Sequence, residues 1–457
     1  MLRSPATDHT LKLIGIALLA VAASVAAAAA PAVLVAVGDV TPTSAVLWVR
    51  GAGAGRVTIA YGPAGSPPTS TASVAVTPAT DLTGQVMLSG LAPATRHAYR
   101  VQSNGVTADG EFVTAPSPEA LARVRFVWSG DLGGGKFCRS IESGYKIFRA
   151  MATSRPDFFL FVGDTIYADH RCGGPDVVAG ADFVATTLGG YHGKHRYNRE
   201  DPAAAAFYAS TVVLPIWDDH EVRNDFSGPS DPLMTLGRQA FLDYWPIARP
   251  TEEPGRLYRR FQWGRLLDVF ILDTRQYRSS NRDPDGPGKT MLGGAQRRWL
   301  IDGVTASSAT WKVIVSSVPL SVPTGPATAH DSWSNASVFG VPEDNTTGFA
   351  FERDLIVRAL RDRAVKNVVF VAADVHYAEL IRHQPTSSFS FHEFIAGPLS
   401  ATQGRPRPLD QGLNPRSLFA RGGVNNFGEI TVDRDLLTVR IIDDDGATLF
   451  THAIGPE

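Results

Sequence analysis

The stretch DFFLFVGDTIYAD, residues 157–169, decides the fold. Its first half is an unbroken apolar run that stops at Gly163 and Asp164. A run of this kind, bounded by a turn residue, predicts a strand that is buried on both faces. Gly163 lets the backbone turn where the strand ends. We therefore expect Asp164 and Tyr167 at the rim of a sheet, where open α/β sheets bind their ligands.

The same sequence pattern recurs along the chain. Further apolar, strand-like runs also end in an acid, and histidines follow two of them. The residues at these ends are Asp131, Asp164, Asp218 with Asp219 and His220, Asp273, and Asp374 with His376. Helical patterns at residues 141–153, 233–244, 293–304 and 351–364 alternate with the strands, which predicts a layered α/β domain.

The acids at the strand ends point to a metal site. Neighbouring carboxylates raise each other's pKa, and a multivalent cation removes that difficulty. Oxygen ligands with few histidines and no obligatory cysteine favour hard metals such as Fe(III), Ca, Mn or Mg. Tyr167 favours a trivalent ion, because a strong Lewis acid is needed to deprotonate a phenol with a pKa of about 10.

Composition limits the class of protein. The chain has 457 residues, of which 44% are hydrophobic and 19% charged, and its formal net charge is −2. This length predicts two or three domains in a globular protein. The charge gives no support for a nucleic-acid partner or for a polybasic membrane-surface protein.

The N-terminus predicts export. Arg3 and Lys12 precede a short apolar segment, and an alanine tract follows to Ala30. This pattern indicates a signal peptide at residues 1–30 and a secreted or periplasmic protein; an uncleaved anchor helix is the alternative. No second apolar stretch is long enough to span a membrane, so no stable span is expected after cleavage.

The remaining chain divides in two. Short strand-like runs separated by turn residues predict a β-sandwich at residues 31–116, and the α/β pattern occupies residues 121–457. The two cysteines, Cys138 and Cys172, leave two alternatives open. They form one disulfide in an exported protein, or they are unrelated free thiols.

Five ordered motifs carry a resemblance to a known family. Together with Asp131-Leu132-Gly133, the strings GDTIYAD, WDDHEVRND, LDTRQYR and ADVH resemble the PhoD-type alkaline phosphatases and phosphodiesterases. These belong to the calcineurin-like metallophosphatases and are related to purple acid phosphatases. The resemblance covers roughly residues 121–457. It implies a four-layer α-β-β-α sandwich with mixed sheets, preceded by a small all-β domain of fibronectin III or immunoglobulin type.

The resemblance also implies the ligands of two metals. Fe(3+) would be held by Asp131, Asp164, Tyr167 and His376. Asp164 would bridge to a Ca(2+) site formed with Asp219 and Asp374, and Asn224 would be a further ligand. Some relatives place a cysteine at the first motif as an iron ligand, which here leaves Cys138 as a remote alternative.

The implied activity is hydrolysis of phosphate monoesters or diesters by metal-bound hydroxide. His220 would protonate the leaving oxygen, and Arg139 and Arg275 would neutralise phosphate oxygens; pairing of Arg275 with Asp273 is the structural alternative. A small phosphate ester is the expected partner, and the oligomeric state is open. The alternatives are a phospholipase D-type phosphodiesterase on the same scaffold and, remotely, a non-catalytic secreted binding protein.

Three further expectations concern the surroundings of this site. Asp169 is expected to cap a loop. The histidines His170, His192, His195 and His330 are expected to be solvated, with the alternative that one of them lines the substrate pocket. Loops 170–210, 278–292 and 321–350 are expected to wall the substrate pocket.

Overall fold

The computed structural model describes residues 1–2, 32–134, 137–341, 343, 346–434 and 436–457. Ala32–Glu457 form one compact unit. The predicted signal peptide lies outside the described residues except for its first two. Within the described part of the chain, we find no helix that is both long and apolar enough to cross a membrane.

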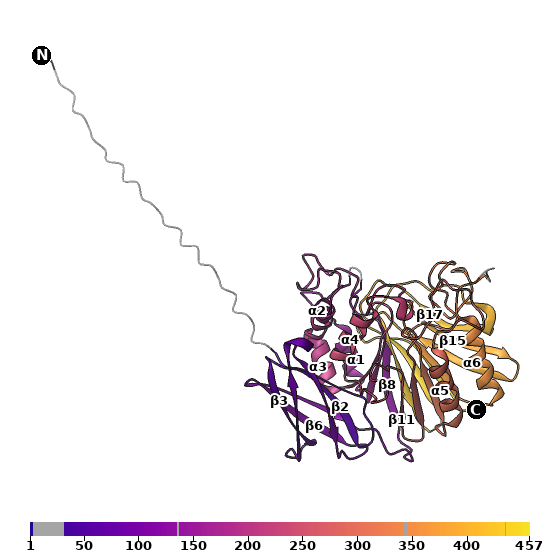
Figure 1. Cartoon of the computed structure of the whole chain (residues 1–457), viewed down its shortest axis with the longest axis horizontal. Helices are drawn as coiled ribbons and strands as arrows, with labels where there is room; N and C mark the ends of the chain where they lie inside the picture. Colours follow the sequence, from indigo (N-terminus) through magenta and orange to yellow (C-terminus); the bar gives the residue numbers. More distant parts are fainter. Residues whose placement is uncertain (3–31, 135–136, 342, 344–345, 435) are drawn as a thin grey trace. The chain divides into compact units, whose positions relative to one another are not determined.

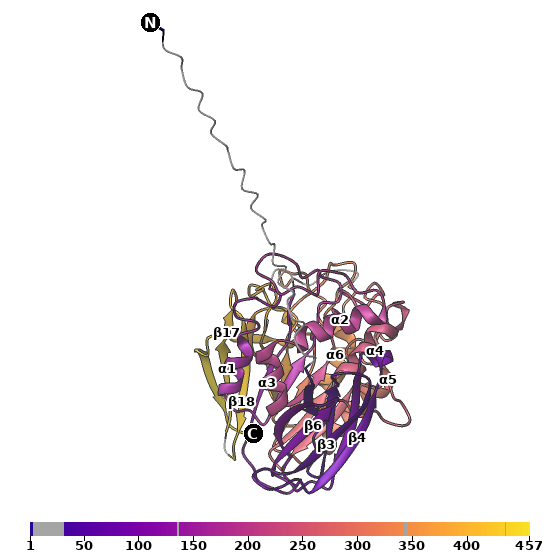
Figure 2. The same ribbon diagram turned by 90° about the vertical axis from the view of Figure 1, so that its left-hand side faces the viewer.

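The first part of this unit is all β. A three-stranded sheet has the order β1-β2-β5, and a four-stranded sheet has the order β4-β3-β6-β7. Their bounds are β1 Leu34–Gly38, β2 Ser44–Arg50, β3 Gly55–Pro63, β4 Ser70–Val76, β5 Thr83–Ser89, β6 Arg96–Ser103 and β7 Val106–Val113, with a 3-10 turn η1 at Pro78–Thr80. Figure 2 shows β3, β4 and β6 running together, in indigo and violet.

Two mixed sheets form the rest. The six-stranded sheet runs β10-β9-β8-β18-β19-β20, and the seven-stranded sheet runs β11-β12-β13-β14-β16-β15-β17. Their bounds are β8 Val124–Ser129, β9 Phe158–Val162, β10 Val212–Ile216, β11 Arg259–Trp263, β12 Leu267–Ile271, β13 Trp311–Val315, β14 Val368–Ala372, β15 Ala378–Thr386, β16 Phe389–Ile395, β17 Pro415–Arg421, β18 Asn426–Val432, β19 Leu437–Asp443 and β20 Thr448–Ile454. β8, β9 and β10 are parallel, as are β12, β13, β14 and β16.

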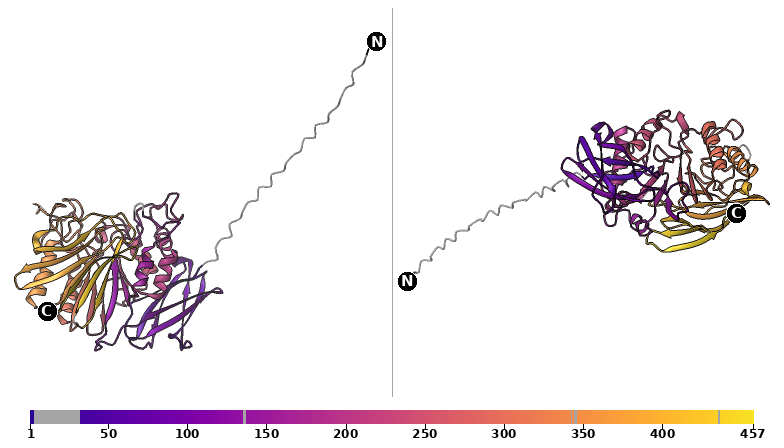
Figure 3. Two further views of the ribbon diagram at one scale, coloured as in Figure 1. Left: turned by 180° about the vertical axis from the view of Figure 1, so that it is seen from behind. Right: turned by 90° about the horizontal axis from the view of Figure 1, so that it is seen from below.

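Six α-helices accompany these sheets. They are α1 Ile147–Thr153, α2 Leu188–Arg199, α3 Pro202–Ser210, α4 Met234–Tyr244, α5 Gly293–Ala306 and α6 Ala350–Asp362, with 3-10 turns η2 Gly228–Ser230 and η3 Gln411–Leu413, all counted within the described residues. Figures 1 and 3 show α5 and α6 together beside the seven-stranded sheet. The indigo β strands of the first part lie on the other side of the compact unit.

Alternation along the strands explains the layers. Val269, Val313 and Val369 belong to the core shared with the six-stranded sheet, whereas their neighbours Phe270 and Ile314 belong to the core under α5 and α6. Side chains of successive strand residues point to opposite faces, so a strand covered on both sides must be apolar throughout. The α-β-β-α class and the mixed sheets predicted from the sequence are therefore confirmed.

The opening stretch shows this most clearly. β9 is completely buried. On one face the Phe158 ring stacks 4.9 Å from that of Phe126, and on the other the Phe161 ring meets Trp245 edge-on at 5.4 Å.

The expectation that residues 170–210 form only a loop was wrong, because α2 and α3 lie in this segment. The start of α3 carried a readable signal. The Asp201 carboxylate accepts hydrogen bonds from the N–H groups of Ala203 and Ala204, and Pro202 occupies the first turn. Both features are typical of a helix N-terminus.

Candidate metal centre

The site lies where the parallel strands of both sheets end. After β8, β9 and β14 the chain turns through residues in the left-handed conformation: Asp131, Asp164, Asp374 and His376 have φ of 65°, 49°, 71° and 62°. This conformation is uncommon for residues other than glycine and costs of order 1–3 kcal/mol each. Four such residues at one edge indicate that the fold positions these side chains at the expense of local backbone strain.

Asp164 belongs to two groups of candidate ligands. The first group contains Asp131, Asp164 and His376, and the second contains Asp164, Asp219 and His220. Within each group, the ligand atoms all lie within 4.8 Å of one another. The Tyr167 hydroxyl lies 2.9 Å from His376 Nε2. Six of the predicted site residues therefore come together, with Asp164 between the two groups.

Burial makes this cluster unfavourable without a cation. Desolvation, together with the charges of Asp218 and Asp219, raises the pKa of Asp164 and of Asp374. Desolvation also raises the pKa of Asp131, again with Asp218 contributing. Buried carboxylates of this kind are normally paired or coordinated to a metal.

The oxygens themselves show where a cation fits. Both carboxylate oxygens of Asp131, Oδ1 of Asp219 and Oδ2 of Asp374 are buried without a hydrogen-bond partner among the described residues. Buried polar atoms in native proteins nearly always have a partner. These residues therefore fit a metal centre with oxygen ligands. Asp374 is not a member of the two close groups described above, and its place as a ligand stays a prediction.

Asp219 differs from the other acids. Burial alone would raise its pKa, but the positive charges of His220 and Arg275 lower it below the ordinary range. Its Oδ2 accepts a hydrogen bond from the Asp225 N–H at 2.6 Å. This carboxylate is therefore held as an anion by its surroundings.

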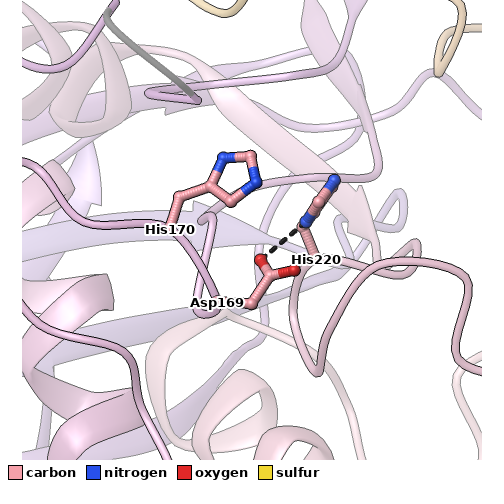
Figure 4. Close-up of side chains that lie close together, drawn as sticks. All are labelled: Asp169, His170 and His220. Carbon is pink, nitrogen blue, oxygen red and sulfur yellow. Dashed lines mark hydrogen bonds and ion pairs between the residues drawn. The ribbon is translucent and has the colours of Figure 1, made fainter.

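His220 is oriented by a carboxylate that the sequence reading treated only as a loop cap. Nδ1 of His220 lies 2.7 Å from Asp169 Oδ1, and the other oxygen of Asp169 accepts from the Asn224 N–H at 2.8 Å. Figure 4 shows the Asp169 carboxylate directed at His220, with the His170 ring beside both. Burial lowers the pKa of His220, but Asp219 and Asp169 outweigh it and raise the pKa to about 9.

The expectation that four histidines are solvated was wrong. The His170 ring centroid lies 5.0 Å from that of His220, and the ring stacks 5.2 Å from Tyr167. His192, His195 and His330 are buried. His170 thus lies beside the site, in keeping with the alternative that one of these histidines lines the pocket.

Arg275 is buried in ion pairs, which favours the structural alternative over the predicted contact with phosphate oxygens. The side chain has no exposed surface. Its Nε donates to Asp218 at 2.6 Å, and its two terminal nitrogens donate to Asp331 at 2.7 Å each. The alternative role, in which Arg275 pairs with Asp273, was wrong about the partner, because the guanidinium pairs with Asp218 and Asp331. Arg275 thus ties the loop that carries Asp218 and Asp219 to the segment that carries Asp331.

Arg139 and Asn224 are less close to the cluster than expected. Arg139 Nη1 donates to the carbonyl of Tyr197 at 3.1 Å, and its Nε lies 3.8 Å from Asp201. These contacts hold Arg139 against α2. Asn224 is exposed, and it meets the site through its backbone N–H. Its side chain stays a predicted ligand.

The two cysteines are joined. Cys138 and Cys172 form a disulfide with an S–S distance of 2.07 Å. This settles the alternatives that the sequence left open, and it removes Cys138 as an iron ligand because its sulfur is not a thiolate. The bond links the segment after Asp131 to the segment after Tyr167.

Glu221 is a positioning residue that the sequence reading missed. One of its oxygens accepts from the N–H and hydroxyl of Thr165 at 2.6 and 2.7 Å, and the other accepts from the Asp218 N–H at 2.8 Å. It therefore ties the loop after β9 to the loop after β10. Glu221 stands in the string WDDHEVRND, and this position was the sequence feature that could have identified it.

Taken together, the paired sheets and the shared edge of acids, histidine and tyrosine define a candidate dinuclear metal centre. The family description PhoD-like phosphatase matches residues 133–439, and the N-terminal domain of PhoD-like phosphatases matches residues 20–116. Because the first match covers more than half of the chain, the chain belongs to the PhoD-like phosphatase family, and the resemblance seen in the motifs is confirmed.

Known proteins agree with this assignment. Alkaline phosphatase D of Bacillus subtilis (strain 168) is 27% identical over 325 residues, which cover 63% of this chain and 52% of that protein. The chain thus spans about half the length of that relative. A solved structure of PhoD superposes with a TM-score of 0.74 at 21% identity, covering 92% of this chain and 88% of that one. The purple acid phosphatase PPD1 of yellow lupin (Lupinus luteus) gives 0.65 at 12% identity, covering 93% and 74%. These two structures share the fold.

Proposed function

We propose that this chain is an exported metal-dependent phosphoesterase that hydrolyses phosphate monoesters or diesters. The observation that carries the proposal is the group of buried, unpartnered carboxylate oxygens on Asp131, Asp219 and Asp374 around Asp164. The family match and the similarity to alkaline phosphatase D support it.

The metals we propose are Fe(3+) and Ca(2+). Asp131, Asp164, Tyr167 and His376 would hold the ferric ion, since a phenolate is a ligand for a strong Lewis acid. Asp164, Asp219 and Asp374, with Asn224, would hold calcium, which prefers oxygen ligands. When bound, such a pair lowers the pKa of a water ligand and neutralises the oxygens of the phosphoryl group.

His220 would supply the proton for the leaving group. Asp169 accepts the hydrogen bond of Nδ1, which fixes the ring and leaves Nε2 for the substrate. With a pKa raised to about 9, the ring is protonated at neutral pH. A proton from Nε2 would pass to the departing ester oxygen, so that an alcohol leaves in place of an alkoxide.

Two observations support export. The predicted signal peptide at residues 1–30 is one, and the domains at 31–116 and 121–457 would follow it. The other is the Cys138–Cys172 disulfide, because disulfides form and persist mainly in oxidising compartments such as the periplasm and the extracellular medium.

The test is metal analysis joined to a substrate panel. Purified protein would be assayed with p-nitrophenyl phosphate, bis-p-nitrophenyl phosphate and phosphatidylcholine, and its iron and calcium would be measured. We expect about two metals per chain and turnover of a mono- or diester that the Asp164→Asn variant lacks. Preference for phosphatidylcholine would favour the phospholipase D-type alternative. Metal-free protein with full activity, or loaded protein with none, would contradict the proposal.

A further inference from the structure

The two arginines predicted to bind the phosphate are both engaged in contacts with other parts of the described chain. Arg275 is buried against Asp218 and Asp331, and Arg139 is held by Tyr197 and Asp201. The cluster itself is mostly closed to solvent, but the His376 side chain is 22% exposed. A substrate would therefore approach the cluster from the side where His376 meets solvent.

A segment of the chain, residues 402–408, lies against His376 on that side. His376 Nδ1 donates to the carbonyl of Thr402 at 2.6 Å, and the Gly404 N–H donates to the carbonyl of His376 at 2.7 Å. The Arg407 N–H donates to the hydroxyl of Tyr377 at 3.3 Å. Three hydrogen bonds thus fix this segment to His376 and its neighbour.

The composition of the segment makes it stiff. A Cβ at Gly404 would lie 2.6 Å from the Val375 carbonyl oxygen, so only glycine allows this close approach. Pro406 and Pro408 each fix their own φ and restrict the residue before them to extended backbone. Arg407, between the two prolines, is therefore presented from a backbone with little freedom.

The segment carries two exposed arginines, Arg405 and Arg407, and the second of them is fixed by contacts on both its backbone and its side chain. The Nη1 of Arg407 donates to the carbonyl of Pro323 at 3.2 Å. Among the described residues no carboxylate lies within ion-pairing distance of it, in contrast to Arg139 and Arg275.

We propose that Arg407 binds a second anionic group of the substrate, so that the site prefers phosphate esters that carry another phosphate away from the one being hydrolysed. The inference rests on the proposed function. The reacting phosphate would lie over the acids at the strand ends, whereas Arg407 is anchored at the rim, outside that cluster. A guanidinium binds phosphate through parallel hydrogen bonds, which an exposed arginine with free nitrogens can supply.

The experiment compares two chromogenic diesters that differ by one phosphate. They are the p-nitrophenyl ester of thymidine 5′-phosphate and the same ester with an added 3′-phosphate. We expect wild-type protein to prefer the second. Arg407→Ala should lower kcat/KM for it about tenfold, mostly through KM, and change the first by less than about twofold, because one charged hydrogen bond is worth about one factor of ten.

Matched variants separate binding from folding. Arg407→Lys keeps the positive charge but lacks the planar guanidinium, and it should retain part of the preference for the substrate with the added 3′-phosphate. Arg358→Ala removes an exposed arginine of α6 and should change neither substrate. Metal content and the thermal midpoint should be the same in all three variants and the wild type. An equal loss for both diesters in Arg407→Ala, or no loss for either, would overturn the inference.

A binding measurement keeps the inference testable if the proposed activity fails. Calorimetry would compare thymidine 3′,5′-bisphosphate with thymidine 5′-phosphate on the wild type and on Arg407→Ala. Tighter binding of the bisphosphate that disappears in the variant supports the role of Arg407 whatever the turnover. Equal affinities in the wild type refute it.

Discussion

Replacing Asp131 by asparagine should have opposite effects on the metal-free and the metal-loaded protein. The Asp131 side chain is fully buried, both of its oxygens are unpartnered among the described residues, and its φ of 65° suits asparagine well. The substitution therefore removes a charge with little change in shape or backbone strain.

The size of the effect follows from the spacing of the carboxylates. Ligand oxygens of Asp131 and Asp164 lie within 4.8 Å. Two unit charges at that distance repel by about 3 kcal/mol at an effective dielectric constant of about 20. In the presence of a chelator at about pH 8, we expect Asp131→Asn to raise the free energy of unfolding by about 1–3 kcal/mol, because part of the charge is already lost through the raised pKa.

The pH dependence has a definite sign. Since the folded-state pKa of Asp131 is raised, the folded wild type binds more protons than the unfolded chain as the pH falls toward the ordinary pKa of aspartate. The wild type therefore gains stability from this group on acidification, and the variant does not. The advantage of the variant should shrink between about pH 8 and about pH 5.

The assay is unfolding in urea with and without chelator, with metals counted on the same samples. Without chelator the variant should lose one metal per chain and unfold at lower urea than the wild type. Asp302→Asn, at a carboxylate that is 71% exposed, is the control and should change nothing. A variant that is less stable than the wild type in chelator at about pH 8, or that keeps both metals, would refute this reasoning.

Three further predictions concern the neighbours of the cluster. Tyr167→Phe should keep the packing of a buried ring that lies 4.1 Å from His220 but abolish the visible charge-transfer band of a ferric phenolate; a retained band would exclude tyrosine as its source. Asp169→Asn removes the carboxylate that helps raise the pKa of His220, so the alkaline limb of the pH profile of kcat should move to lower pH. The value of kcat should fall about tenfold or more, and the metal content should be unchanged. Arg275→Met leaves Asp218 buried without its cation, while Asp331 keeps its ion pair with Arg278, and should cost about 3 kcal/mol in thermal or urea unfolding, whereas a direct role in phosphate binding would lower activity and leave stability intact.

The parts of this molecule that the sequence predicted are the local ones. β9 and its terminal Asp164 lie within one short segment, so apolar run, turn and acid could be read together. The parts that could not be predicted are set by distant pairings. Arg275 meets Asp331 across 56 positions, and the string LDTRQYR offers the nearer Asp273 as the obvious partner. Arg407 was missed because only the fold brings the segment at residues 402–408 against His376.

Those distant pairings also give Asp219 and Asp131 different electrostatic surroundings, so the pKa values of the two carboxyl groups shift in opposite directions. Asp219 stands beside His220 and within 3.9 Å of Arg275, and its pKa is lowered. Asp131 has no hydrogen-bond partner among the described residues, and its pKa is raised. His220 and Arg275 therefore favour the anionic form of Asp219, whereas burial and neighbouring carboxylates favour the protonated form of Asp131, as they do for Asp164 and Asp374. The Tyr167 phenol must also give up a proton to bind a metal, and its pKa is raised by burial and by the neighbouring acids, which supports the proposal of a trivalent ion on that side of the cluster.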